Sequence, residues 1–203
     1  MGALQRDKRV DTRMKQNKGE NNGKTKNTEK KNTKKDDEIV FKQIPATDGG
    51  QIKDLHDAVY ESMERKELYI PKTDKHFTKI FKPNYITYSY GAYVGDKLIG
   101  MASVLVGKEF TKQYAKILKI KHKQVCNLGH YLMLPEYQRR GIMTKLQNIV
   151  LDYARTAGYK YIIGTAHAEN IASVSVLGKV MKPYEKIIMT KSGFKRQLFW
   201  AQI

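Results

Sequence analysis

The stretch LPEYQRRGIMTKL, residues 134–146, places two arginines and a glycine where an apolar segment gives way to a helical pattern. The first N–H groups of a helix have no partner inside the helix, and the helix dipole adds partial positive charge there. Glycine lets a phosphate approach the backbone, and arginines add full charges. The stretch predicts a pyrophosphate site formed by Gln138, Arg139, Arg140, Gly141, Ile142, Met143 and Thr144. The plainer alternative is a basic loop that needs its glycine only for its backbone angles.

Two histidines are candidates for acid–base chemistry, because imidazole titrates close to neutral pH. His130 lies in the apolar segment before this loop, and His167 ends the next one. Each also has a structural interpretation, as a half-exposed strand residue and as a loop or capping residue. Glu109 is expected to pair with nearby lysines, and Cys126 to be a small buried apolar residue. The five histidines and single cysteine have no metal-ligand spacing, so no metal is predicted.

Apolar periodicity predicts the elements that position these residues. Strand patterns cover 39–44, 85–94, 97–106, 125–134, 159–165, 184–190 and 195–203, and helical patterns cover 52–63, 74–81, 142–157 and 171–181. Residues 107–124 fit either a helix or long hairpin arms. Asp74 and Asn170 are expected to cap the helices that follow them. The order β-α-α-β-β-β-α-β-α-β-β predicts an α/β fold with a mixed sheet and helices on its faces, and its strand–helix–strand unit implies a parallel pair.

Residues 1–37 differ in composition from the rest of the chain. They hold 12 of the 38 Lys/Arg and 6 of the 20 Asp/Glu, and no aromatic residue. Such a segment buries too little apolar surface to offset its ordering entropy, so we predict a disordered basic tail before one domain at 38–203. The remaining 26 basic and 14 acidic residues leave that domain with a charge of +12. This charge favours the binding of a phosphorylated cofactor, an acidic substrate or nucleic acid. Of these, the tail would contact nucleic acid.

The single cysteine excludes an intramolecular disulfide framework and fits a reducing compartment. No run of residues approaches the ~20 apolar residues that a membrane span needs. The first residues contain no apolar core of a secretory signal. A cytoplasmic protein is therefore expected.

The segment YLMLPEYQRRGIMTKL resembles the acetyl-CoA signature of the GCN5-related N-acetyltransferases, the GNAT superfamily. Gln138, Gly141 and Met143 fill its Gln/Arg-x-x-Gly-x-Gly/Ala positions. A second segment, HAENIASVSVLGKV, is similar to the family's His-x-x-Asn-x-x-Ser, here residues 167, 170 and 173. The resemblance covers about residues 38–203. It implies a GNAT-like acyl-CoA N-acyltransferase fold, with a central mixed sheet of about seven strands flanked by about four helices.

The resemblance also implies roles for individual residues. Backbone groups of Tyr131, Leu132 and Met133 would pair with the pantetheine arm of acetyl-CoA. A backbone N–H near residue 133 or 134 would polarise the thioester carbonyl. Residues 139–144 would hold the pyrophosphate, and Asn170 and Ser173 would meet the cofactor where the two parallel strands part. The acceptor amine would then attack the thioester directly while a base removes its proton, often through a water molecule.

Two positions depart from the family pattern. Met143 stands where the signature has a small residue, so a flexible side chain lies close to the expected phosphate path. Leu177 stands seven residues after the asparagine, where many members have the tyrosine that protonates the departing thiolate. Tyr184 is the nearest residue that could replace that acid.

Two hypotheses follow for the function. The first is an acetyl-CoA-dependent N-acetyltransferase that acts on a small-molecule amine or a peptide. The alternative is a catalytically weak or inactive module of the same fold, which binds CoA or a polyanion such as RNA through its basic surface and tail.

Overall fold

The computed structural model describes residues 38–80, 87–189 and 193–203. The predicted tail at 1–37 lies outside the described residues, as do Phe81, the first residues of the strand predicted at 85–94, and Lys191 and Ser192 of the last predicted turn. The described residues group as one compact unit.

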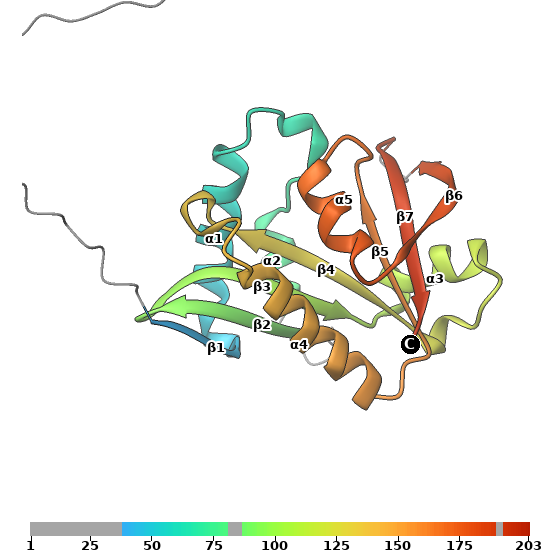
Figure 1. Ribbon diagram of the computed structural model, residues 1–203, viewed down its shortest axis with the longest axis horizontal. Helices are drawn as coiled ribbons and strands as arrows, with labels where there is room; N and C mark the ends of the chain where they lie inside the picture. Colours follow the sequence, from blue (N-terminus) through green and yellow to red (C-terminus); the bar gives the residue numbers. More distant parts are fainter. Residues whose placement is uncertain (1–37, 81–86, 190–192) are drawn as a thin grey trace, which may run out of the picture. The chain divides into compact units, whose positions relative to one another are not determined.

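A single mixed sheet runs through the molecule, with its strands in the order β1-β2-β3-β4-β5-β7-β6 (Figure 1). The strands are β1 (Ile39–Gln43), β2 (Thr87–Val94), β3 (Lys97–Leu105), β4 (Val125–Met133), β5 (Tyr161–Ala166), β6 (Lys182–Met189) and β7 (Lys195–Gln202). The pair β4–β5 is parallel and the other neighbours are antiparallel. The predicted mixed sheet of seven strands and its parallel pair are confirmed.

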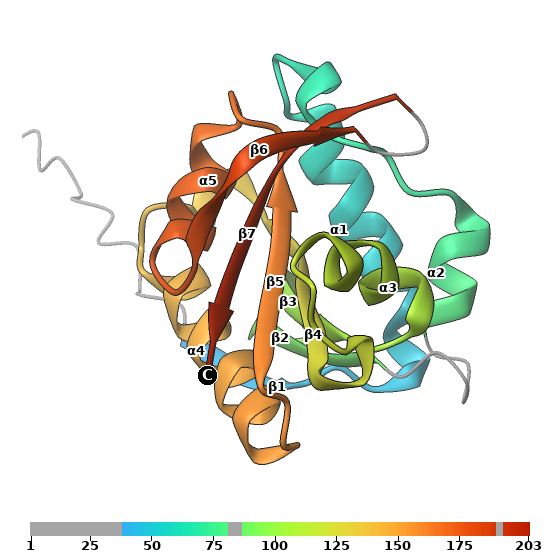
Figure 2. The same cartoon turned by 90° about the vertical axis from the view of Figure 1, so that its right-hand side faces the viewer.

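The helices of the described residues lie on both faces of this sheet. They are α1 (Gly49–Glu61), α2 (Asp74–Ile80), α3 (Lys108–Ile117), α4 (Ile142–Thr156) and α5 (Ile171–Gly178), with 3-10 turns η1 (Ala46–Asp48), η2 (Lys66–Leu68), η3 (His122–Gln124) and η4 (Pro135–Tyr137). Helices α4 and α5 cover one face, and α1, α2 and α3 lie on the other (Figure 2). No helix among the described residues is long and apolar enough to cross a membrane.

The undecided segment 107–124 contains helix α3, so the described chain has a helix between β3 and β4 that the predicted order lacks. Thr111, Tyr114 and Ala115 are buried at three- and four-residue spacing, while Lys112 and Lys116 are exposed between them. That spacing matches one face of a helix. The sequence did not distinguish a helix from hairpin arms, because the apolar side chains of this segment also suit strands. The helix is favoured by its packing against β4, which the local pattern does not show.

Burial on both faces explains why the sequence of β3 shows no alternation of apolar and polar residues. Every residue from Leu98 to Leu105 is buried, because helices lie on both sides of this central strand. Leu146 and Val150 of α4 are fully buried, and α4 packs against β2 and β3. A strand covered on both faces loses the alternation that a half-exposed strand shows.

Two predicted caps have different outcomes. Asn170 is confirmed as the cap of α5, since its Oδ1 accepts a hydrogen bond from the Ser173 N–H at 3.1 Å. Helix α2 begins at Asp74 itself, and the carbonyl of Thr73 accepts the first N–H groups, so Asp74 is a first-turn residue rather than the cap. Helix α5 ends at Gly178, three residues earlier than predicted, and β6 begins at Lys182.

Candidate active site

The parallel pair β4–β5 opens into a gap part-way along the sheet. The two strands pair over only three positions, from Val125 opposite Tyr161 to Asn127 opposite Ile163. Strand β4 then continues to Met133 alongside β3, and β5 runs to Ala166 alongside β7, so the two strands diverge (Figure 1). The gap leaves backbone groups of β4 without a β5 partner, where an extended ligand can pair with them.

A bulge in β4 stands beside this gap. Gly129 lies opposite Ser103 and Leu132 opposite Met101, so His130 and Tyr131 together oppose one residue of β3. His130 takes the left-handed backbone conformation, with φ of 48°. A bulge bends its strand and redirects side chains, which is how His130 comes to project beside the gap.

The backbone N–H groups at the end of β4 point alternately toward β3 and toward the gap. The Leu134 N–H donates to the Ile99 carbonyl at 3.0 Å, so this group and that of Leu132 point toward β3. By the same alternation the Met133 N–H points to the opposite side, into the gap. Gln138 Nε2 donates to the Met133 carbonyl at 3.3 Å and supports this strand end. The N–H group that points into the gap is therefore that of Met133 and not that of Leu134.

The start of α4 faces the same region with its backbone uncapped. Gly141 is the N-cap residue in the left-handed conformation, with φ of 75°, and no side chain accepts from the first N–H groups. Arg139 also has positive φ, at 60°. The Met143 side chain is partly buried and packs against the main core. An uncapped start of this kind suits an anionic group.

Three cations surround this helix start. Arg139 and Arg140 are exposed, and the Arg140 guanidinium lies 5.2 Å from the centre of the Tyr137 ring. Lys179, just after α5, donates from its Nζ to Thr144 Oγ1 at 2.8 Å. Lys179 could not be identified from sequence spacing, because it follows Thr144 by 35 positions and only the packing of α5 beside α4 brings them together.

A cavity of about 240 Å³ passes through the sheet at the gap. Asn170 and Ser173 line it from the α5 side, and Lys72 and His76 line it from the side of α2. His130 and Tyr131 of β4 also line it, so the structure brings together four of the predicted site residues here. Leu177, at the position of the family tyrosine, is buried in the same wall.

His130 is the titratable residue at the centre of this cavity. Its Nε2 lies 2.9 Å from His76 Nε2, with the rings edge to face, and its Nδ1 is buried without a hydrogen-bond partner. Burial, followed by the neighbouring charges of His76, Lys72 and His56, holds the pKa of His130 well below 6.5. The imidazole is therefore neutral at pH 7 and has a lone pair to accept a proton.

The other two predicted catalytic residues lie elsewhere. His167 follows β5, where its Nδ1 accepts from the Glu169 N–H at 3.3 Å, and it does not line the cavity. Tyr184 is in β6, packs against a second apolar cluster, and is also absent from the cavity wall. Cys126 is buried as expected, and burial raises the pKa of its thiol to about 12.

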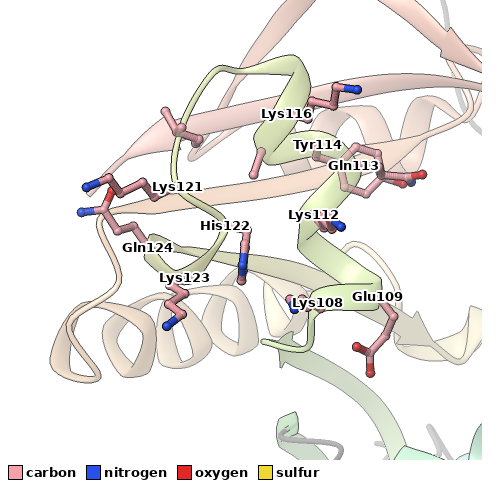
Figure 3. Close-up of a pocket in the computed structure, with 12 residues that line it drawn as sticks. Lys108, Glu109, Lys112, Gln113, Tyr114, Lys116, Lys121, His122, Lys123 and Gln124 are labelled. Carbon is pink, nitrogen blue, oxygen red and sulfur yellow. The ribbon is translucent and has the colours of Figure 1, made fainter.

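A separate hollow of about 1150 Å³ lies against α3 and η3 (Figure 3). The basic residues in its lining are Lys108, Lys112, Lys116, Lys121, His122 and Lys123. Glu109 makes no ion pair with any of these lysines within 4 Å in the described chain, so its predicted pairing is wrong; the side chain instead folds back beside Gly107. No group of His, Cys, Asp or Glu in the described ranges is arranged to hold a metal ion.

The family model described as the acetyltransferase (GNAT) family matches residues 51–181, which include both strands of the gap and the start of α4. The chain belongs to this family. The resemblance that its two motifs suggested is confirmed. No curated protein sequence is similar enough to the chain to count as a match.

Solved GNAT structures share the fold at low sequence identity. Arabidopsis thaliana NAA60 in complex with acetyl-CoA is 15% identical, with a TM-score of 0.64 over 82% of this chain and 99% of that one. The ribosomal-protein-S18-alanine N-acetyltransferase of Escherichia coli is 14% identical, with a TM-score of 0.59 over 82% and 94%. The paiA N-acetyltransferase of Thermoplasma acidophilum, in complex with coenzyme A, is 13% identical, with a TM-score of 0.57 over 82% and 99%. These matches show the GNAT fold and leave the acceptor open.

Proposed function

We propose that this GNAT protein transfers an acetyl group from acetyl-CoA to a primary amine by direct attack. The observation that carries the proposal is the position of the uncapped α4 start next to the gap between β4 and β5. One feature suits a pyrophosphate and the other suits an extended pantetheine arm. Family membership supports the same co-substrate.

The residues divide into those that hold the co-substrate and those that face the acceptor. The backbone of 139–144, with Lys179, would hold the pyrophosphate, and the open edge of β4 from Tyr131 to Met133 would hold the arm. Asn170 and Ser173 lie at the same gap. Acetyl-CoA would supply the activated acetyl group as a thioester. The acceptor nitrogen forms the new N–C bond as the C–S bond breaks, and the sulfur leaves as thiolate and takes up a proton.

His130 is the base in this proposal. We assign the tautomer in which His130 Nε2–H donates to His76 Nε2, which leaves the lone pair of Nδ1 as the proton acceptor. Nδ1 accepts the proton that the amine loses, and the proton on Nε2 then passes to His76, so His130 returns to its neutral form. His167 and Tyr184 are not assigned a step, because neither lines the cavity.

A second candidate function is the binding of a polyanion such as RNA. The lysine hollow of α3 and η3 favours it, because clustered cations on an open surface attract phosphates. This binding does not exclude acetyl transfer, since the hollow is distinct from the start of α4.

Thiol release from acetyl-CoA with a broad panel of amines tests the proposed transferase. We expect release with at least one amine, and for Arg140→Ala a rise of about tenfold in the KM for acetyl-CoA, because one charge-assisted phosphate contact is worth about 1.5 kcal/mol. Arg155→Ala is the matched control, since it removes an exposed arginine at the other end of α4. Equal KM values for the two variants would show that the Arg140 side chain does not contact the phosphates.

A further inference from the structure

The far side of the cavity through the sheet carries two cations that the transfer chemistry does not use. Lys72 follows η2, and Arg196 lies in β7, so chain segments distant in sequence converge here. Arg196 Nη2 donates to the Thr165 carbonyl at 2.9 Å, and Nη1 donates to the Leu68 carbonyl at 3.5 Å. These bonds fix the guanidinium, while its Nε is buried with no hydrogen-bond partner.

No counter-charge inside the described chain neutralises this pair. Neither Lys72 nor Arg196 has a carboxylate within 4 Å among the described ion pairs. Glu109 is the acidic side chain of the described cavity wall, and its carboxylate lies beside Gly107. Burial raises the pKa of Tyr69 to about 12, so that hydroxyl is uncharged at neutral pH.

The surroundings of the two cations favour an anion beside them. Burial and the charge of Arg196 together lower the pKa of Lys72, and burial lowers the pKa of Arg196. Like charges held in partly buried positions cost free energy unless an opposite charge satisfies them. A carboxylate or phosphate group can accept hydrogen bonds from a guanidinium and an ammonium together, and these charge-assisted bonds offset that cost.

We propose that Lys72 and Arg196 form an anion subsite that selects a small primary amine carrying a carboxylate or phosphate group. The proposal rests on the proposed acetyl transfer and adds the class of acceptor to it. The anionic group sits between Lys72 and Arg196, and the amine extends along the cavity toward His130, which lines the same 240 Å³ space. This volume suits a small amine, and the two cations repel a polyamine.

Matched pairs of acceptors test the subsite by thiol release. Each pair differs only in the anionic group: an amino acid against its amide, and phosphoethanolamine against ethanolamine. We expect at least one acidic member to exceed its neutral partner tenfold or more in kcat/KM, and the better pair identifies the anion as carboxylate or phosphate. Lys72→Met should bring the ratio of kcat/KM values between the acidic and the neutral member close to one, because a change that affects both members equally cancels in this ratio. Lys160→Met, at an exposed lysine before β5, should leave the preference intact.

Binding without turnover separates this proposal from the proposed transferase. Succinate and inorganic phosphate, added to the full chain, should raise the melting temperature of the parent and of Lys160→Met by more than that of Lys72→Met, in which only the other anion-binding surfaces remain. If no amine is acetylated and this difference is still seen, the anion subsite stands and acetyl transfer is overturned. If amines are acetylated with no preference for the acidic member and no effect of Lys72→Met, the subsite is overturned and the transferase stands.

Discussion

At the scale of single residues, His130 combines an unusual backbone with an unusual electrostatic position. Its φ of 48° places it in the left-handed region, and its side chain contacts His76 of α2 inside the cavity. Burial, His76 and Lys72 together keep the pKa of this imidazole low. Asn also tolerates the left-handed region, so His130→Asn removes the imidazole without a large backbone cost.

The depressed pKa of His130 predicts how stability changes with pH. An unfolded chain takes up a proton on this imidazole near its ordinary pKa of 6.5, and the folded protein resists it. The free energy of unfolding therefore has its full value above pH 6.5 and falls as the pH drops below it. Between pH 7.5 and 5.5 we expect the parent to lose about 1 kcal/mol more than His130→Asn in urea denaturation.

The same variant checks the assignment of the base. Turnover of His130→Asn should fall about 100-fold or more, with acetyl-CoA still raising its melting temperature as in the parent. Parallel stability curves for the two proteins would contradict the buried neutral imidazole, and undiminished turnover would contradict its role as base.

At the scale of elements, the start of α4 depends on one backbone conformation. Gly141 has φ of 75°, and a Cβ added there would meet no atom within 4 Å. Any cost of substitution therefore comes from the backbone angle and not from a clash. The hydrogen bond from Lys145 N–H to the Gly141 carbonyl shows that the helix begins directly at this residue.

Replacement of Gly141 tests that conformation. Gly141→Ala should lower the free energy of unfolding by about 1 kcal/mol, because alanine disfavours positive φ, and Gly141→Asn should lower it by about half as much. Urea denaturation of the three proteins measures both values. An alanine variant as stable as the parent would mean that the turn before α4 does not need the left-handed conformation.

At the scale of the whole molecule, charge is distributed unevenly over distinct surfaces. Residues 38–203 carry +12 by sequence, and the structure places part of this excess on the hollow of α3 and η3 and part at the start of α4. The two surfaces can therefore be changed separately. Only the first is relevant to the second candidate function.

Salt dependence tests polyanion binding by the lysine hollow. The logarithm of the binding constant of the full chain for single-stranded RNA should fall linearly with the logarithm of the salt concentration, with a slope of about 0.7 per phosphate contacted. Replacement of Lys112, Lys116 and Lys121 by Gln should lower this slope by about 2 and leave thiol release unchanged. The control is the same replacement of three exposed lysines, Lys160, Lys186 and Lys195. An unchanged slope in the first variant would exclude the hollow as the RNA surface.

Local interactions made much of the fold and half of the site predictable. A helix start, its cap and its glycine involve residues within a few positions of each other, as at Gly141 and Asn170, so composition and spacing were enough to locate them. Strand order followed from the alternation of strand and helix patterns. Segment 107–124 was the exception, because both of its interpretations satisfy the local pattern equally well.

The acceptor side depends on contacts that no local pattern encodes. His76 and His130 are 54 positions apart, and they meet because the β4 bulge redirects one of them toward α2. Lys72 and Arg196 converge only once β7 lies beside β5 and places the guanidinium against the Thr165 carbonyl. Sequence alone therefore determined the family and located the helix start and cap, because these are short motifs whose hydrogen bonds join residues close together in the chain. The buried histidine pair and the anion subsite required the tertiary structure, because strand register and packing set the distances between side chains far apart in the chain.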